Sequence, residues 1–269
     1  MMEKTLVLKF GGAALKDVAQ FDNVAAIIEE MTKSYQRVCI VVSAMEGVTD
    51  FLENLASKVH DNPPKREKDM LLSAGERISM ALLAMTLQKR GIEAVSFTGS
   101  QAGIITTSEH TNAKIIDVKP FRLEAVFREG KIPIIAGFQG VSMDKEITTL
   151  GRGGSDTTAA ALAIALGAER AVFYKDVEGV CTKDPKQFPE AEVVETLTYR
   201  EALRVIGEGK NAVLHPRCVE LAMKNQLILQ VRSFDMKLKD KMGSIVFSVQ
   251  TNRSCKSKIY EEAVKEEKL

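Results

Sequence analysis

Short runs of aliphatic and β-branched residues recur along the chain, and longer segments with helical spacing of apolar residues lie between them. Strands that are apolar throughout and alternate with helices are typical of a mostly parallel sheet covered on both faces. The chain is therefore expected to adopt an α/β fold. The predicted strands are residues 5–10, 37–44, 94–98, 132–138, 171–176, 228–234 and 244–248, and the predicted helices are residues 21–33, 69–90, 120–129, 155–166 and 216–225.

Glycine and polar residues gather where several of the predicted strands end. KFGGAAL closes the run at 5–10, VVSAMEGVTD closes the run at 37–44, and YKDVEGVCTKDP closes the run at 171–176. In open α/β sheets, ligands bind outside the carboxyl ends of the strands. These loops are therefore predicted to line one cleft.

The balance of charge limits the partners that the chain can attract. Its 269 residues include 37 Lys and Arg against 36 Asp and Glu, a formal net charge of +1. This even balance gives no electrostatic footprint for nucleic acid or for an anionic membrane. Neither partner is predicted, and any anion has to be held by a local site.

Cysteine usage and the lengths of the apolar runs indicate a cytoplasmic protein. Cys39, Cys181, Cys218 and Cys255 are scattered without Cys-x-x-Cys spacing, which favours reduced thiols over a zinc site. The N-terminal apolar run is too short for a signal peptide. The run at 159–166 is too short to span a membrane.

The first strand ends on Lys9, and Gly11 and Gly12 follow it directly. Two glycines allow close backbone approach, and a lysine supplies a point charge for transferring oxygens. This combination suits a phosphoryl group. A tight strand-to-helix turn with a solvent-exposed lysine is the alternative.

GRGGSDTTAAALA, residues 151–163, places Ser155 and Asp156 where the N-cap of a helix is expected. The positive end of that helix could receive an anion. Arg152 offers a fork of donors that matches a carboxylate, and Asp156 could hold nearby lysines in position. A capped helix after a flexible loop is the alternative, but it does not explain three glycines together with an arginine.

Several motifs of other nucleotide-binding proteins and of hydrolases are missing. The sequence has no G-x-x-x-x-G-K-[ST], no G-x-G-x-x-G and no G-x-S-x-G segment. His60, His110 and His215 have no evident partner spacing, so each is predicted to be structural. In LSAGERISMALLA, residues 72–84, spacing alone favours a solvated Glu76 over one that binds an ammonium group.

Motifs spread along residues 5–247 together resemble the aspartate kinase branch of the amino acid kinase family. TLGRGGSDTTA distinguishes this branch from the acetylglutamate, glutamate and uridylate kinases, which share the fold. The matching segments, in chain order, are KFGG, VVSAMEGVTD, LSAGERIS, TGSQAGIIT, IPIIAGFQG, TLGRGGSDTTAAALA, YKDVEGVCTKDP and VLHPRCVELA.

The resemblance implies a three-layer α/β/α sandwich with a mostly parallel central sheet. Residues 1–250 would form the catalytic domain, with 1–140 mainly a phosphoacceptor lobe and 141–250 mainly an ATP lobe. Residues 251–269 are expected to be a charged, helical tail, with no ACT domain after it. Feedback regulation is then expected to be absent or to come from a separate regulatory chain, and the family suggests a homodimer.

The resemblance further implies an enzyme that phosphorylates the β-carboxylate of L-aspartate with Mg-ATP, the first step toward lysine, threonine, methionine and diaminopimelate. The Mg²⁺ would be carried by the nucleotide, without protein ligands. Glu76 would take the α-ammonium group, contrary to the expectation from spacing. The implied catalytic residues are Lys9, Gly11, Gly12 and Asp156; those that bind aspartate are Ser43, Thr49, Glu76, Arg152 and Ser155; those that bind ATP are Lys175, Asp176, Gly179, Lys183 and Lys186.

The sequence also departs from the family pattern. Ala13 and Ala14 replace a Thr-Ser pair, Cys181 replaces an aromatic residue, Lys186 replaces an arginine, and Ala212 stands where some members have lysine. The loss of a stacking surface could weaken adenine binding, and the altered loop positions leave open a weakened or inactive regulatory paralogue. A kinase of the same fold for another small carboxylate is a further alternative.

Overall fold

The computed structural model describes residues 4–183, 188, 190–208, 213–248 and 258–262. Its central sheet has eight strands in the order β10-β12-β11-β9-β1-β2-β6-β3, and the β11–β12 pair is the antiparallel one. This confirms the predicted α/β class. The strands are β1 (Thr5–Phe10), β2 (Arg37–Val42), β3 (Ala94–Phe97), β6 (Ile132–Ala136), β9 (Arg170–Lys175), β10 (Thr196–Thr198), β11 (Ile228–Ser233) and β12 (Ser244–Phe247).

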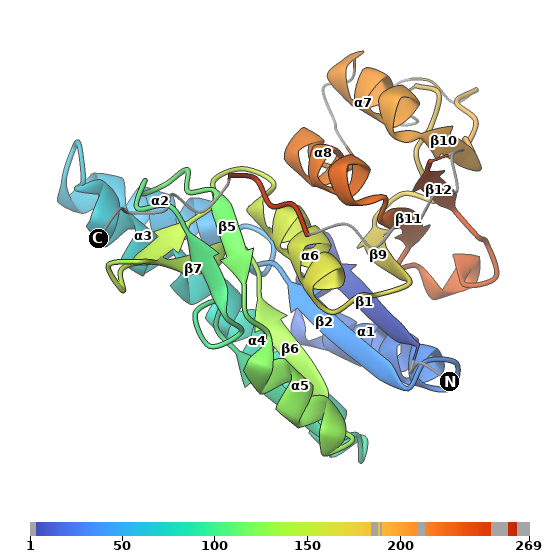
Figure 1. Cartoon of the computed structure of the whole chain (residues 1–269), viewed down its shortest axis with the longest axis horizontal. Helices are drawn as coiled ribbons and strands as arrows, with labels where there is room; N and C mark the ends of the chain where they lie inside the picture. The colour runs from blue at the N-terminus through green and yellow to red at the C-terminus, as the bar shows by residue number, and fades with distance from the viewer. Residues whose placement is uncertain (1–3, 184–187, 189, 209–212, 249–257, 263–269) are drawn as a thin grey trace.

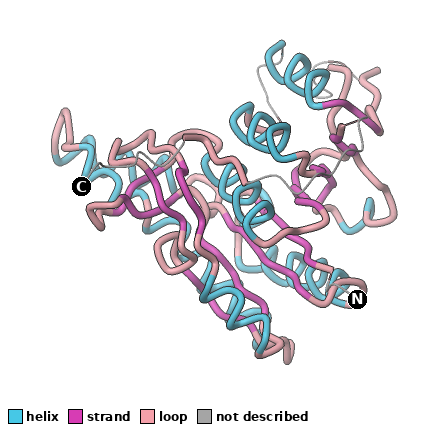
Figure 2. Tube along the Cα trace, in the orientation of Figure 1, coloured by secondary structure: helices cyan, strands magenta, loops and turns pink. Residues whose placement is uncertain are grey.

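Helices cover both faces of the central sheet (Figure 1). Successive side chains of β1 point to opposite faces, so that Leu8 and Phe10 join one core cluster and Val7 joins the other. In Figure 2 the helices accordingly lie in front of and behind the strands, as the three-layer prediction requires. One cluster includes α1 (Val18–Thr32) and α4 (Ala74–Lys89), and the other includes α5 (Phe121–Arg128), α6 (Gly154–Ala165), α7 (Tyr199–Glu208) and α8 (Pro216–Asn225).

The alanine-rich helix α6 is buried along its whole length. It packs on β1, β2 and β9 on one side and on α8 on the other. Small side chains allow a helix to lie this close to both neighbours, because a larger residue would push the layers apart. The run of alanines in the sequence is therefore explained by packing, and it fixes the start of α6 at the edge of the sheet.

A second sheet of four short strands stands beside the central one, and β5 and β7 mark it in Figure 1. It is absent from the sequence-based prediction, because its strands are short and mix buried with half-exposed residues. Its order is β5 (Ile115–Val118), β4 (Ile104–Thr106), β7 (Gln139–Ser142) and β8 (Ile147–Thr149).

The helix expected at 69–90 is two helices. The first, α3 (Lys65–Leu72), ends before Ser73, and α4 starts at Ala74. Gly75 lies close to the loop after β2, where an added Cβ would come within 2.9 Å of the Ala44 Cβ atom. The preceding helix α2 (Val48–Val59) was not predicted, although Phe51, Leu55 and Val59 follow helical spacing.

The stretch Lys65–Lys89, formed by α3 and α4, is long and apolar enough to cross a membrane by length and composition. Half of its most apolar window is buried inside the protein. Its α4 part packs on β3 and β6 and against α1, which is the position of a core helix.

The predicted helical tail is wrong for the part that the structure describes. Residues 258–262 are not helical but lie against the domain, where the Glu261 amide donates to the Ile115 carbonyl at 3.0 Å. A charged segment can dock on the domain instead of forming a helix when its side chains pair with partly buried groups, as Glu261 does with Arg217.

Candidate active site

The site lies at the carboxyl ends of β1, β2 and β9, which are neighbours in the central sheet. Lys9 is the last residue but one of β1 and pairs in register with Phe173, and Lys175 ends β9. Parallel strands bring their carboxyl ends to the same edge, so the two lysines converge there. The start of α6 meets them at this edge.

Asp156, in the first turn of α6, holds both lysines. Its Oδ1 atom lies 2.8 Å from Lys9 Nζ, and its Oδ2 atom lies 3.1 Å from Lys175 Nζ. The Lys9 and Asp156 side chains are only 6% and 7% exposed. Three charged groups with a net positive charge are thus fixed beside the positive end of a helix, which is a setting suited to an anion.

Burial and pairing shift the pKa values of this cluster in a consistent way. Burial alone would raise the pKa of Asp156, but Lys175 and Lys9 outweigh it and hold that pKa well below its usual range. Burial lowers the pKa of Lys9, although Asp156 opposes that effect. Asp156 therefore stays ionised, and its charge favours the charged form of Lys9 against the effect of burial.

The glycine loop continues β1 at the same edge. Gly11 is extended and precedes the 3-10 turn η1 (Gly12–Leu15), and its missing Cβ would lie 3.5 Å from Lys9 Nζ. A Cβ on Gly12 would come within 3.1 Å of the Ala44 carbonyl oxygen, so the loop packs closely on the end of β2. The half-buried Ser43 is tied to the same place, since its amide donates to the Phe10 carbonyl at 3.1 Å.

The loop before α6 adopts two left-handed conformations. Gly151 has φ of +73° and Gly153 has φ of +69°, which favour glycine. Gly153 is the N-cap of α6, so the expected N-cap positions of Ser155 and Asp156 are corrected to the first helical turn. There Ser155 is buried, with its side chain against Gly137. Because the turn is built from glycine backbone, the Asp156 side chain is available for the lysines.

Arg152 is exposed and lies between those two glycines. It forms no hydrogen bond or ion pair with any residue within the described ranges. Its guanidinium group is therefore available to a ligand.

Glu76 is buried, with an exposed fraction of 4%, and the expectation of a solvated carboxylate from spacing is wrong. One oxygen accepts the Ala44 amide at 3.1 Å, and the other is buried without a hydrogen-bond partner among the described residues. Burial raises the pKa of Glu76 to about 7, against the opposing effect of backbone amides and Lys9. A buried carboxylate oxygen without a partner can accept a hydrogen bond from a ligand. The small residues beside Glu76, above all Gly75, are the feature of the sequence that indicates its burial, because they let α4 approach the loop after β2.

The remaining residues of the implied nucleotide site are more spread out. Asp176 follows β9 and is exposed, and Gly179 is buried where a Cβ would meet the Ser244 hydroxyl at 2.5 Å. Lys183 lies 3.4 Å from Glu190 and over the ring of Phe188. Lys186, like Ala212, lies outside the described residues. Thr49 is half-buried in the first turn of α2, on the acceptor side.

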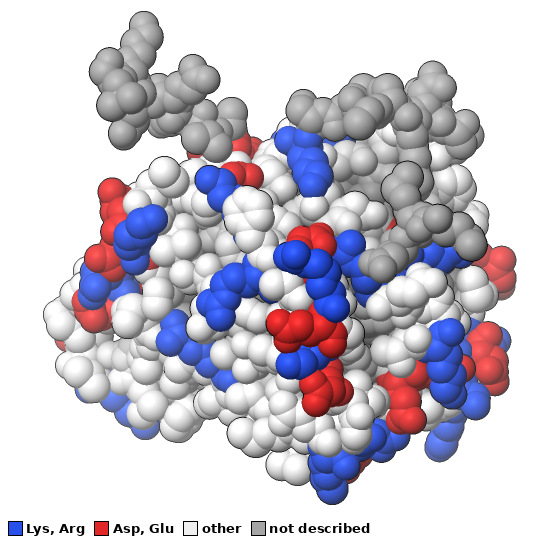
Figure 3. Space-filling view, turned by 60° about the horizontal axis from the view of Figure 1, so that its bottom comes forward, with Lys and Arg blue, Asp and Glu red and all other residues white. Residues whose placement is uncertain are grey.

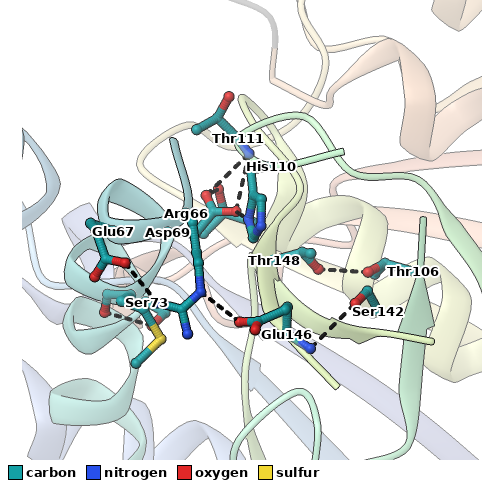
Figure 4. A network of polar contacts seen from close by, with 12 residues as sticks. Arg66, Glu67, Asp69, Ser73, Thr106, His110, Thr111, Ser142, Glu146 and Thr148 are labelled. Carbon is teal, nitrogen blue, oxygen red and sulfur yellow. Dashed lines mark hydrogen bonds and ion pairs between the residues drawn. The ribbon is translucent and has the colours of Figure 1, made fainter. Parts of the chain in front are cut away.

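A buried carboxylate that the sequence did not single out supports the loop before α6 (Figure 4). Asp69 of α3 is fully buried and accepts from the Thr149 hydroxyl at 2.5 Å and from the Thr111 amide at 3.1 Å. His110 Nδ1 lies 2.7 Å from the same carboxylate, which gives this histidine a partner that its spacing did not reveal. Asp69 sits in a strongly charged stretch, KREKD, where nothing local marks one acid as buried.

The surface agrees with a locally held anion. Figure 3 shows basic and acidic side chains intermixed on the face in view, without an extended basic patch there. Within the described part of the chain, no group of three or more His, Cys, Asp or Glu side chains is placed to hold a metal ion.

A model of the amino acid kinase family matches residues 4–233 of the chain. The aspartokinase of Mycolicibacterium smegmatis is 50% identical over 242 residues, which cover 90% of this chain and 56% of that protein. The chain thus spans little more than half the length of that relative.

Solved structures give the same picture. The aspartate kinase of Synechocystis matches with a TM-score of 0.78 and 40% identity, covering 93% of this chain and 41% of that one. The aspartokinase III of E. coli, solved with aspartate and ADP, matches with a TM-score of 0.79 and 24% identity, covering 93% of this chain and 66% of that one. At that identity the second match shows the fold.

Proposed function

The chain belongs to the amino acid kinase family, and from this premise we propose that it is the catalytic unit of an aspartate kinase. It transfers the terminal phosphoryl group of ATP to the β-carboxylate of L-aspartate and forms L-4-aspartyl phosphate. The observation that carries the proposal is the buried cluster of Lys9, Asp156 and Lys175 at the start of α6. An amino-acid biosynthetic role, toward lysine, threonine and diaminopimelate, follows from that activity.

Phosphoryl transfer depends mostly on positioning and on neutralising the charge that spreads over the transferring oxygens. Lys9 contacts those oxygens, and the backbone at Gly11 and Gly12 lets them approach closely. Asp156 acts through the two lysines that it holds. An aspartate carboxylate has an ordinary pKa of about 4, so it is already ionised near pH 7 and needs no general base.

The acceptor binds between Glu76, which has one oxygen without a partner, and Arg152, which has no hydrogen-bond or ion-pair partner among the described residues. Glu76 receives the α-ammonium group on its unsatisfied oxygen, and Arg152 forms a bidentate pair with a carboxylate. Ser43, Thr49 and Ser155 supply hydroxyl and backbone groups around them. Opposite charges at the two ends of the site favour a small zwitterion that carries one further carboxylate.

ATP lies on the β9 side of the site, next to Lys175, Asp176, Gly179 and Lys183. Lys186 is assigned to the same site by the resemblance alone, because it lies outside the described residues. Asp156 is already engaged by two lysines, which fits a Mg²⁺ ion that is held by the nucleotide phosphates and water. The metal would supply further charge neutralisation on those phosphates. Residues 141–250 are then mainly the nucleotide lobe and 1–140 mainly the acceptor lobe.

A second copy of the chain is the proposed partner, and it covers an apolar surface on α2 and α4. Phe51 and Val59 of α2 are 58% and 88% exposed, and Ile78 and Met85 of the neighbouring α4 are exposed as well. Phe51→Glu should shift the sedimentation of the protein from dimer to monomer. Phe121→Glu, at an exposed residue of α5, is the control that should not.

The proposed cell compartment is the cytoplasm. Cys39 and Cys218 are buried free thiols, and reduced cysteines are typical of that compartment. We also propose that any feedback regulation comes from a separate regulatory chain. Lysine and threonine at millimolar concentration should then leave the activity of the isolated chain unchanged, and inhibition would contradict the proposal.

A weakened paralogue is the second candidate, because Ala13 and Ala14 stand where the family pattern has hydroxyl residues. Ala14 is fully buried in the core cluster of Phe10 and Leu15, so only Ala13 has room to present a hydroxyl to a ligand. Ala13→Thr should therefore raise the rate strongly if the site is weakened. It should change the rate little if the site is already competent.

The function is tested by trapping acyl phosphate as hydroxamate with Mg-ATP and L-aspartate. L-Glutamate, N-acetylglutamate and UMP serve as competing acceptors, with ADP release as the common signal. Aspartate-dependent product is expected, and it should vanish in Lys9→Ala but persist in Lys16→Ala, an exposed lysine nearby. A folded protein that binds ATP and is silent with every acceptor would favour the paralogue, whereas product from a different carboxylate would change the substrate.

A further inference from the structure

The segment 258–262, which we call the strap, docks on the domain through several specific contacts. The Asn225 side chain donates to the Ile259 carbonyl at 2.7 Å and accepts the Ile259 amide at 2.9 Å. Lys258 donates to the Ala165 carbonyl, at the end of α6, at 2.6 Å. Tyr260 packs on the core cluster that contains α6 and α8. These contacts place the strap across α8, α6 and β5.

Glu261 of the strap forms a nearly buried ion pair with Arg217. Its Oε1 atom lies 2.6 Å from Arg217 Nε and its Oε2 atom lies 3.0 Å from an Arg217 terminal nitrogen. The two side chains are 10% and 15% exposed. Oε2 also accepts the Ile115 amide at 2.8 Å, so the carboxylate is held at three points.

Arg217 also contacts the loop before α6 and so connects Glu261 to it. Its guanidinium group donates to the Leu150 carbonyl and, at 2.9 Å, to the Ala113 carbonyl. Leu150 directly precedes Gly151 and Arg152. The same turn of α8 begins at His215, whose ring fills the space that a Cβ on Gly153 would occupy, at 2.0 Å. The first turn of α8 therefore touches the loop on both sides of Arg152.

We propose that Glu261 and Arg217 are positioning residues, through which the strap fixes the Arg152 loop for binding the acceptor carboxylate. The inference rests on the proposed function, because it assigns Arg152 to the acceptor. Glu261 holds the Arg217 guanidinium in the plane in which it reaches Leu150. Without that anchor, the loop between Leu150 and Gly153 gains freedom, and part of the binding free energy of the acceptor is spent on ordering it.

The loop is also held by contacts that do not involve the strap, which limits the expected effect. Thr149, one residue before Leu150, is tied to the buried Asp69, and the Leu150 amide donates to Phe138 at 2.8 Å. Loss of the strap contact should therefore loosen Arg152 without displacing Lys9 or Asp156. Binding of the acceptor is affected, and the nucleotide side and the transfer step are not.

The test compares Glu261→Gln with Glu262→Gln in the full chain. Both changes remove one negative charge, but Glu262 is exposed and has no part in the Arg217 contact. Glu261→Gln should raise the KM for aspartate about tenfold, as expected for a lost charge-assisted hydrogen bond, with the KM for ATP and kcat changed less than about twofold. Glu262→Gln should match the native chain in all three.

Arg217→Lys is the second variant, because a lysine keeps the charge but cannot bridge Glu261 and Leu150 together. It should reproduce the rise in the aspartate KM, and the double variant with Glu261→Gln should be no worse than the more affected single variant. Additive losses would mean that the two residues act separately and would overturn the proposal.

Hydrogen exchange supplies a readout that does not need activity. The Gly154 amide donates to the Gly151 carbonyl at 3.0 Å, and faster exchange of this amide is expected in Glu261→Gln but not in Glu262→Gln. If the native chain forms no aspartate-dependent product, the proposed function fails while this comparison still decides the strap contact. Equal exchange and equal aspartate KM in the two variants would overturn the inference. If Glu261→Gln does not fold, Asn225→Ala, which loosens the strap without touching the ion pair, decides by the same two measurements.

Discussion

Two groups of charged residues near the edge of the sheet differ in how their charges are paired. We call Lys9, Asp156 and Lys175 the phosphoryl cluster, and we call Glu76 and Arg152 the acceptor grip. In the phosphoryl cluster, Asp156 pairs with Lys9 and Lys175, and the charges of this buried group are satisfied by one another. In the acceptor grip, Glu76 keeps an unsatisfied buried oxygen, and Arg152 is exposed without a partner in the described structure. Paired charges stabilise the fold before any ligand arrives. The buried oxygen of Glu76 is satisfied only by a ligand and so lowers stability, whereas the exposed Arg152 is hydrated until a ligand binds it.

The largest expected effect is that of Asp156→Asn, which leaves two lysines at the site without their carboxylate. Breaking one partner out of a buried pair costs about 3–5 kcal/mol, and misplacing Lys9 should lower kcat by roughly 10³-fold. Urea unfolding and hydroxamate formation measure the two effects. Asp22→Asn, at an exposed residue of α1, is the control, and equal stability of the two variants would contradict the pairing.

The acid stability of the native chain checks the same cluster. Because the folded pKa of Asp156 lies below its ordinary value of 3.8, its stabilising contribution is present above that value and is lost as the pH falls further. Asp156→Asn should therefore unfold more readily than the native chain at neutral pH, and the difference should shrink in strong acid.

Glu76→Gln should separate stability from function. The folded pKa of about 7 lies above the ordinary 4.5, so the contribution of Glu76 to stability is full below 4.5 and is lost as the pH rises through 7. The variant should thus be more stable than the native chain at pH 8, by up to roughly 3 kcal/mol, and equal to it near pH 4. It should also lose about 10²-fold in kcat/KM for aspartate, because the ammonium group loses its charged partner.

Thermal melting at the two pH values and initial rates with aspartate measure these changes. Glu109→Gln, an exposed glutamate, is the matched control and should change neither. A loss of stability at pH 8 in Glu76→Gln would show that the second oxygen already has a partner in the free protein.

The pH dependence of kcat/KM sharpens the comparison further. An ammonium group binds the ionised form of Glu76, so kcat/KM for aspartate should rise about tenfold between pH 6 and pH 8, with a midpoint near 7. The KM for ATP should change less over that range, because Glu76 is assigned to the acceptor side of the site. An aspartate profile without a step near pH 7 would remove Glu76 from the acceptor site.

Arg152→Gln should have the smallest effect on stability. An exposed side chain without partners changes the free energy of unfolding by less than about 0.5 kcal/mol, yet the KM for aspartate should rise by tenfold or more. Denaturant unfolding and substrate titration measure both. A large loss of stability would mean that Arg152 has a structural role and would weaken the contrast between the two regions.

Much of the central fold was predictable because its signals are local. The predicted strand 5–10 matches β1 and the predicted helix 216–225 matches α8, since each element shows its apolar pattern within a few residues. Helix α2 carries a helical spacing that the prediction did not use, whereas the second sheet was missed because its short, half-buried strands obtain their stability from neighbours distant in the sequence. The same reason explains why spacing alone gave the wrong environment for Glu76.

The sequence by itself determined the α/β class, the loops that gather at the strand ends, and the residue types of the phosphoryl cluster. Glycine motifs and apolar strands are properties of contiguous residues, and they leave a readable pattern. Tertiary structure alone decided which charges are buried and with whom they pair. Asp69 meets Thr149 across 80 positions and Arg217 meets Glu261 across 44, and no local pattern records such pairs. Burial removes water from these groups only when the chain has folded, so the value of each charge is set by neighbours that the sequence does not place beside it.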